Sequence, residues 1–210
     1  FYGLVGSGRS EMARAIFGET NAQKGKILFE NEDISHITTQ QAVNRKIFYV
    51  PEDRGTQGLF AAHNVRRNMS ASFLNLLSSR LGIMNSKKET RAVQDNIEKY
   101  SIKVESQDDM IMMLSGGGQQ KVLLCWWLLE QPKVIFLDEP TRGIDVATKT
   151  EIHKYIIELA QQGVAVMLIS SDLPEVMALS DEVITMHSGA ITAHFDRAEA
   201  TEKNILKYAL

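Results

Sequence analysis

The sequence predicts an α/β fold with a mainly parallel sheet core, a small antiparallel β part and a helical subdomain. Residues 134–137 and 164–169 form continuous apolar runs without alternation, which is typical of parallel strands covered on both faces. Between them, Ile152 and Ile156 recur on one side of a predicted helix that Gly163 would end. Strands that alternate with helices in this way favour a parallel sheet.

Shorter elements surround this centre. Residues 1–2 resemble the end of a buried strand, and the glycine-rich loop after them leads into a helix through Phe17, with Gly18 as its C-cap. Residues 26–29 and 47–50 predict short strands that end in polar or proline-marked turns.

The middle of the chain predicts helices, and its end predicts a β-hairpin. Residues 64–114 predict a helical subdomain, in which Ser86 and Glu89 have the spacing of a capping box. Three methionines near its end, at positions 110, 112 and 113, are expected to fill the core. Residues 182–186 and 190–195 flank a predicted hairpin turn.

Composition limits the classes of function. We expect residues 1–210 to form one domain, a fragment that lacks upstream strands, and no apolar run approaches the roughly 20 residues of a membrane span. A net charge of -3 and a pI near 6.0 disfavour nucleic-acid binding. The one cysteine, Cys125, agrees with a reducing compartment, and the five histidines show no transition-metal spacing.

The first loop has the parts of a phosphate-binding site. Such a loop needs glycines that let backbone N–H groups surround an anion, a helix N-terminus, a long cation and a hydroxyl for magnesium. The candidate nucleotide-binding residues are Gly3, Gly6, Ser7, Gly8, Arg9, Ser10 and Glu11. Arg9 stands where the motif has lysine, so taken alone the loop is also compatible with an ordinary strand-to-helix turn.

The run at 134–137 delivers two carboxylates, Asp138 and Glu139, at the strand end where ligands bind in open α/β sheets. Asp138 is a candidate magnesium ligand, and Glu139 is a candidate to polarise an attacking water. The alternative is a strand that ends in two solvated acids.

A third element, Leu114 followed by Ser115, Gly116, Gly117, Gly118 and Gln119, is a glycine turn at a helix start. It resembles the signature motif of the ATP-binding cassette (ABC) ATPases. Together with residues 51–54, 138–145 and 170–175, the chain is similar along its whole length to the C-terminal cassette of the ribose, galactose, arabinose, xylose and autoinducer-2 importer ATPases. Gly118 replaces this family's usual asparagine, and Trp126 stands where a basic residue is common.

The resemblance implies a cassette that binds ATP and Mg²⁺ and powers sugar uptake by ATP-driven dimer closure. It assigns magnesium to Ser10, Asp138 and Glu52, catalysis to Glu139, Ser171 and Glu52, and the dimer interface to Asp145. It implies a partner cassette, membrane permease subunits, and indirectly a periplasmic sugar-binding protein. The location would be peripheral, on the cytoplasmic side of the bacterial inner membrane.

Three positions differ from active cassettes, where Arg9, Glu52 and Ser171 would be lysine, glutamine and histidine. We therefore expect this chain's own site to bind nucleotide better than it cleaves it, the isolated chain to be nearly inactive, and the signature motif to serve the partner's site. One alternative is a non-hydrolysing regulatory module. Another is an ABC protein of DNA repair or translation, which would carry a coiled-coil insertion or a basic face.

Overall fold

The structure is a computed structural model that describes residues 1–71, 84–128 and 131–210, with the side chains of residues 126–128 outside the description. The side chain of Trp126 and part of the expected 64–114 subdomain thus lie outside the described residues. The chain divides into two compact units. Unit 1 comprises residues 1–49, 133–140 and 153–210, and unit 2 comprises residues 50–132 and 141–152.

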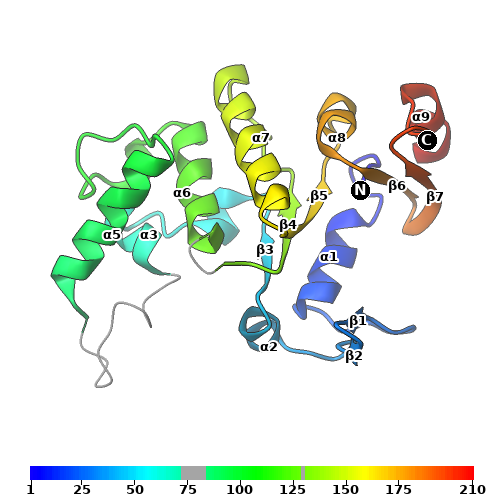
Figure 1. The fold of residues 1–210 in the computed structure, drawn as a ribbon, viewed down its shortest axis with the longest axis horizontal. Helices are drawn as coiled ribbons and strands as arrows, with labels where there is room; N and C mark the ends of the chain where they lie inside the picture. The colour runs from blue at the N-terminus through cyan, green and yellow to red at the C-terminus, as the bar shows by residue number, and fades with distance from the viewer. Residues whose placement is uncertain (72–83, 129–130) are drawn as a thin grey trace. The chain divides into compact units, whose positions relative to one another are not determined.

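Strands and helices alternate between residues 134 and 187, whereas the elements described between residues 54 and 128 are all helical (Figure 1). In chain order the helices and strands are α1 (Arg9–Phe17), β1 (Leu28–Phe29), β2 (Glu32–Asp33), α2 (Thr39–Asn44), β3 (Ile47–Val50), the π-helical turn η1 (Arg54–Gly58), α3 (Val65–Ser70), α5 (Ser86–Lys99), the 3-10 turn η3 (Ile111–Met113), α6 (Gly116–Leu128), β4 (Val134–Asp138), α7 (Val146–Gln161), β5 (Ala165–Ile169), α8 (Leu173–Leu179), β6 (Glu182–His187), β7 (Ala190–Asp196) and α9 (Glu202–Ala209). None of the helices in the described ranges is long and apolar enough to cross a lipid bilayer.

The sheet of unit 1 has the strand order β3-β4-β5, and β4 and β5 run parallel from Val134↔Ala165 to Asp138↔Ile169. Tyr2 extends this arrangement through parallel bridges to Ser170 and Thr185. The parallel alignment brings the end of β4 and the loop after Tyr2 to the same edge of the sheet, which is the edge where ligands of open α/β sheets bind.

Two apolar clusters form the core of unit 1. One comprises Ala13, Ile34, Ala42, Ile47, Tyr49, Phe136 and Ile169, and the other comprises Tyr2, Leu173, Val176, Val183, Phe195, Ile205 and Ala209. The first cluster packs α1 and α2 against the β3-β4-β5 sheet, and the second packs α8 and α9 against the β6–β7 hairpin. Burial stabilises both clusters by about 1.5–3 kcal/mol for each fully buried valine, leucine, isoleucine or phenylalanine.

Several expected boundaries in unit 1 are confirmed. Helix α1 ends at Phe17 with Gly18 as a left-handed C-cap, and the predicted hairpin forms with Ser188 and Gly189 both at positive φ, as a tight turn requires. The strand expected at residues 26–29 is confined to Leu28–Phe29.

Strand β5 is less covered than its apolar run predicted. Ala165 is exposed, whereas Leu168 and Ile169 are buried. Phe1 pairs with the C-terminal end of β5, where its carbonyl accepts from Ser170 N at 3.1 Å.

In unit 2, the capping prediction was wrong by one residue. The N-cap of α5 is Asn85, whose Oδ1 accepts from Lys88 N at 3.1 Å, while Glu89 is buried and accepts from Ser70 Oγ at 2.7 Å. Asparagine is as good an N-cap as serine, and Glu89 is used by the helix packing instead.

The methionine prediction was also wrong, because all three side chains at positions 110, 112 and 113 are exposed. The apolar residues that the turn η3 buries are Ile111 and Leu114, three positions apart, which is the repeat of a 3-10 helix. The thiol of Cys125 on α6 is buried, and burial raises its pKa.

Candidate functional site

The loop before α1 is shaped by its glycines. Gly6 and Gly8 have φ of +83° and +95°, a region that favours glycine, and nothing lies within 4 Å of where a Cβ on Gly6 would point. Gly8 is the N-cap of α1 and offers no side-chain hydrogen bond, so the first N–H groups of α1 have no side-chain cap. A curled loop with uncapped helical N–H groups behind it is suited to an anion.

The β6–β7 turn holds this loop in place. Gly189 N donates to Ser7 O at 2.9 Å, and a Cβ on Gly8 would lie 3.0 Å from the Cα of Gly189. Gly3 is equally confined, because a Cβ there would collide with the Met186 carbonyl. Three of the predicted glycines are thus required by conformation or by close approach.

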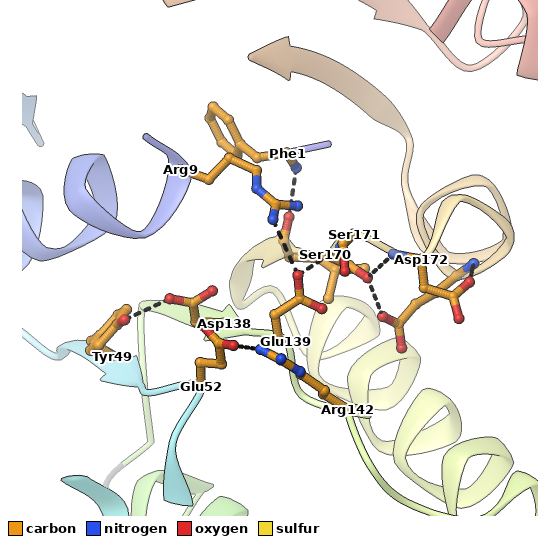
Figure 2. A network of polar contacts seen from close by, with 12 residues as sticks. Phe1, Arg9, Tyr49, Glu52, Asp138, Glu139, Arg142, Ser170, Ser171 and Asp172 are labelled. Atoms are coloured by element: carbon orange, nitrogen blue, oxygen red, sulfur yellow. Dashed lines mark hydrogen bonds and ion pairs between the residues drawn. The ribbon is translucent and has the colours of Figure 1, made fainter. Parts of the chain in front are cut away.

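Asp138, at the end of β4, is held by Tyr49 of β3. The Tyr49 hydroxyl donates to Asp138 Oδ2 at 2.7 Å and accepts from Arg14 Nε at 3.3 Å (Figure 2). Burial raises the pKa of Tyr49, and the bond to Asp138 adds to this shift, so the hydroxyl stays protonated and keeps donating. The carboxylate therefore has a fixed orientation.

Glu139 follows Asp138 in a left-handed conformation, with φ of +46°. A non-glycine residue in this region carries backbone strain, which proteins retain most often at functional sites. Its Oε1 accepts from Ser171 N at 2.8 Å and from Arg9 Nη2 at 3.2 Å (Figure 2). Three of the predicted site residues therefore meet on one carboxylate oxygen.

The Arg9–Glu139 ion pair is buried, with side-chain exposures of 6% and 8%. Burial raises the pKa of Glu139, and the contacts with Ser171 and Arg9 oppose that shift. The arginine that replaces the expected lysine thus binds the very carboxylate that would polarise water.

Buried polar atoms without a partner mark the same edge of unit 1. Among the described residues, Ser7 Oγ, Arg9 Nη1 and Asp138 Oδ1 are buried and form no hydrogen bond. Such atoms cost about 1–3 kcal/mol each if they stay unpaired, so they point to a ligand. The set has two donors for an anion and one carboxylate oxygen for a hard cation.

This donor set fits magnesium, which prefers carboxylate and hydroxyl oxygens together with phosphate oxygens. Asp138 Oδ1 supplies the carboxylate oxygen, and Ser10 supplies a half-buried hydroxyl in the first turn of α1. The third predicted ligand, Glu52, lies in unit 2.

A second polar network supports the segment that contains Ser171. The buried carboxylate of Glu175 accepts from Ser170 Oγ at 2.6 Å and lies 2.8 Å from His153 Nε2. Ser170 Oγ also accepts from Asp172 N at 3.0 Å. These contacts fix the backbone on both sides of Ser171, whose N–H donates to Glu139, while its own side chain is exposed.

In unit 2, Glu52 is ion-paired with Arg142 (Figure 2). Arg142 O in turn accepts from Arg54 Nη1 at 3.3 Å. Glu52, Asp53, Arg54, Gly55, Gln119 and Arg142 line an open hollow of about 480 Å³. The acid that replaces the expected glutamine therefore has an arginine as its counter-charge.

The signature turn, residues 115–119, starts helix α6. Ser115 Oγ accepts from Gly118 N at 3.2 Å and Ser115 O accepts from Gln119 N at 2.9 Å, which makes this exposed serine the helix cap. Gly117 is buried against Thr148, since a Cβ there would lie 2.6 Å from Thr148 Cγ2.

Asp145, the predicted interface residue, precedes α7. Its carboxylate accepts from Thr148 N at 3.0 Å and from Thr148 Oγ1 at 2.8 Å, and these bonds lower its pKa. Because Thr148 also packs on Gly117, the start of α7 and the signature turn support each other within unit 2.

Sequence reasoning missed the residues that support the site: Tyr49, Glu175, His153 and Arg142. Tyr49, His153 and Arg142 act on partners at least 22 residues away, so no local pattern marked them, whereas Glu175 also binds the nearby Ser170. It also missed one exposed group on the β6–β7 hairpin, where Glu182, His194 and Asp196 bring their ligand atoms within 4.8 Å of one another. His194 is already ion-paired with Glu182 at 2.9 Å, and exposed acidic groups are common without an ion.

Comparisons with known proteins identify the family of the chain. A family model described as ABC transporter matches residues 1–142. The chain is 44% identical over 210 residues to a ribose import ATP-binding protein of Caldanaerobacter subterraneus subsp. tengcongensis, covering 100% of this chain and 42% of the relative. It is 42% identical over 209 residues to an arabinose import ATP-binding protein of Pectobacterium atrosepticum, covering 100% of this chain and 41% of that one.

Solved structures show the same fold. A nucleotide-free ATP-binding cassette from an ABC transporter aligns with a TM-score of 0.79 at 23% identity, covering 98% of this chain and 82% of that chain. A dimeric cassette bound to ADP and Pi aligns with a TM-score of 0.78 at 20% identity, covering 93% and 83%. The chain spans about two fifths of the length of the curated relatives that it matches. It has the fold of an ABC cassette, a P-loop NTPase, and it belongs to the ABC transporter family, in which its relatives are sugar import ATP-binding proteins.

Proposed function

We propose that residues 1–210 form the C-terminal of two nucleotide-binding domains in the ATPase subunit of a carbohydrate importer. The domain binds ATP with Mg²⁺ between its own phosphate loop and the signature turn of a partner cassette. Closure of this dimer on ATP drives the membrane permease subunits, which a periplasmic sugar-binding protein supplies. The subunit is peripheral, on the cytoplasmic side of the bacterial inner membrane. The relatives' names and the similarity along the full chain support this assignment.

The proposal for this site rests on the two arms of the Arg9 guanidinium. One arm of its buried guanidinium donates to Glu139, and the other, Nη1, is buried without a partner among the described residues. The free arm is a donor for a phosphate oxygen, together with the Ser7 hydroxyl. The occupied arm ties down the oxygen of Glu139 on which water would be polarised. The site is therefore built to bind a triphosphate and poorly arranged to cleave it.

The chain's own residues have separate tasks in this proposal. The uncapped N–H groups of α1 and the side chains of Ser7 and Arg9 bind and orient phosphate, and Asp138 and Ser10 would hold Mg²⁺. When bound, the ion screens phosphate charge and helps to orient the phosphoryl group for attack. Glu139 accepts the proton of the attacking water in an active cassette. Here that role competes with the Arg9 ion pair.

The geometry also supports a second candidate, a regulatory module that binds nucleotide and does not hydrolyse it. The Arg9–Glu139 ion pair favours it, because it gives Glu139 a structural partner. A single-turnover assay on the complete two-cassette subunit separates the two. If this site hydrolyses, Glu139→Gln slows one of two phases, as the equivalent change in the first cassette slows the other. If the site is regulatory, only the change in the first cassette has an effect.

The isolated chain is expected to show negligible steady-state ATPase activity, since a partner cassette would complete its site. Turnover of about 1 per second or more, the lower end of ordinary enzyme rates, would contradict the proposed weakness of this site.

A further inference from the structure

The side chain of Arg54 lies between two parts of unit 2 to which the proposed function gives different tasks. On one side is the ion pair between Glu52 and Arg142, and on the other is the signature turn. The proposed function places Glu52 at this chain's own nucleotide and the signature turn at the partner's nucleotide. The residue that joins these two parts has no role in the mechanism described above.

Arg54 contacts both parts directly. Its Nη1 donates to Arg142 O at 3.3 Å. Its Nη2 lies so close to Gly116 that a Cβ on that glycine would be 2.7 Å from Nη2 and 3.6 Å from Cζ. The planar guanidinium fork thus spans the carbonyl of one segment and the backbone of the other, a geometry that the single ammonium of lysine does not reproduce.

The backbone that carries Arg54 is fixed. Asp53 Oδ1 accepts from Gly55 N at 2.9 Å, and Asp53 Oδ2 accepts from Thr56 Oγ1 at 2.7 Å, a contact that lowers the pKa of Asp53. Arg54 O accepts from Leu59 N at 2.8 Å and closes the η1 turn. Because the base of the side chain is held, a change at Arg142 or at residues 115–119 is not absorbed by movement of the η1 turn.

We propose that Arg54 is a positioning residue that couples the Glu52–Arg142 ion pair to the signature turn. While the ion pair is intact, the Arg142 carbonyl anchors the guanidinium, which in turn supports the backbone at Gly116. When a ligand competes for the Glu52 carboxylate, Arg142 is released and the signature turn loses this support. Occupancy of one nucleotide site would in this way alter the donors offered to the other.

The coupling is tested first without any nucleotide, by hydrogen–deuterium exchange of residues 115–119 in the complete subunit. Arg54→Ala removes the guanidinium that packs against Gly116 together with its hydrogen bond to Arg142 O, and is expected to speed exchange at residues 115–119 about tenfold, which corresponds to about 1.4 kcal/mol. Arg142→Ala, which keeps the carbonyl but removes the ion pair with Glu52, is expected to speed exchange in the same direction, and Arg54→Lys is expected to lie between wild type and Arg54→Ala. The matched control is Arg45→Ala, which breaks the Arg45–Glu32 ion pair of unit 1 at comparable exposure and should leave these amides unchanged.

A double-mutant cycle tests the ion pair itself. Glu52→Gln and Arg142→Ala should each speed exchange at residues 115–119, and the double variant should be no faster than either alone. Additive effects, or wild-type exchange in Arg54→Ala with an unchanged melting temperature, would overturn the inference. Arg54→Lys provides the same comparison if Arg54→Ala does not fold.

The inference rests on the proposed function only for its consequence, so steady-state ATPase activity forms the second arm. Arg54→Ala is expected to lower kcat of the importer about tenfold with less than a twofold change in KM for ATP, because it moves donors that act in the transition state. If exchange is altered and Ser115→Arg leaves the ATPase intact, the link is correct and the proposed function is wrong. If Ser115→Arg abolishes the ATPase and Arg54→Ala behaves like Arg45→Ala, the inference alone fails.

Discussion

Replacing Arg9 with alanine tests whether this guanidinium holds the triphosphate. Its Nη1 is buried and unpaired among the described residues, while Nη2 donates to Glu139 Oε1 at 3.2 Å. A phosphate oxygen that accepts from Nη1 gains one charge-assisted hydrogen bond, a class worth about 1.5–3 kcal/mol. Since every 1.4 kcal/mol corresponds to a factor of ten, Arg9→Ala is expected to weaken ATP binding about ten- to a hundredfold at this site.

The measurement is isothermal titration of the complete subunit with ATP, with the phosphate loop of the other cassette disabled so that one site remains. Arg45→Ala is the control, because it removes an arginine from an exposed ion pair of the same unit. Arg9→Ala also leaves the buried Glu139 without its counter-charge, so the double variant with Glu139→Gln is titrated in parallel to separate binding from folding. If Arg9→Ala binds ATP within twofold of wild type, the assignment of Arg9 to phosphate is wrong.

Arg9→Lys tests whether the arginine alone limits hydrolysis at this site. Lysine keeps the positive charge but lacks the planar fork that serves Glu139 and a phosphate together. We expect single-turnover hydrolysis to rise less than about threefold, which is under roughly 0.7 kcal/mol, because Glu52 and Ser171 remain as they are. A gain of about a hundredfold from this change alone would show that the other two positions matter little.

Three further predictions address the remaining groups. Ser115→Arg is expected to abolish ATPase activity and uptake in the reconstituted importer, because one lost donor to developing phosphate charge costs about 2.7–4 kcal/mol. Ser171→Ala is expected to change ATPase activity and uptake less than about threefold. If Ser171→Ala is the more damaging variant, the proposed roles of these two serines are wrong. Burial raises the pKa of Glu139 above 4.5, so its stabilising contribution is present below pH 4.5 and is lost as the pH rises through the higher folded value. Urea unfolding of wild type relative to Glu139→Gln should therefore show a stability difference that moves against wild type with rising pH, and a difference independent of pH would contradict the raised pKa. His153→Ala removes one partner from the buried Glu175 carboxylate and is expected to lower the free energy of unfolding in urea by about 2 kcal/mol. This is less than the roughly 3–5 kcal/mol of a fully uncompensated buried charge, because the Ser170 hydroxyl still donates. His153→Gln, which keeps a donor, should recover at least half of the lost stability.

The sequence predicted those parts of the fold and site that depend on local chemistry. The glycines at positions 6 and 8 marked the loop because only glycine adopts their positive φ without strain. The apolar run before Asp138 marked β4 because a strand buried on both faces has no alternation. Both signals lie within a few residues, so no knowledge of tertiary contacts was needed.

The supporting residues were not predictable, because their roles depend on partners distant in the chain. Tyr49 is one of four buried residues of β3, and nothing in that run shows that its hydroxyl meets Asp138. Arg142 follows the acidic pair in an exposed turn, and only the structure pairs it with Glu52. The error at α5 has the same origin, since Glu89 accepts from Ser70 of α3 instead of closing a capping box, and Asn85 is the N-cap.

The Arg9–Glu139 ion pair changes how the retained Glu139 is to be understood. In an active cassette, a glutamate at this position is an argument for hydrolysis. Here the same carboxylate is the counter-charge of a buried guanidinium, and removing one partner of a buried ion pair costs about 3–5 kcal/mol. That cost is a large share of the stability of an ordinary domain, which is about 5–15 kcal/mol. Glu139 is therefore required by Arg9 whether or not water is ever activated, and its presence alone does not favour the hydrolysing site over the regulatory one.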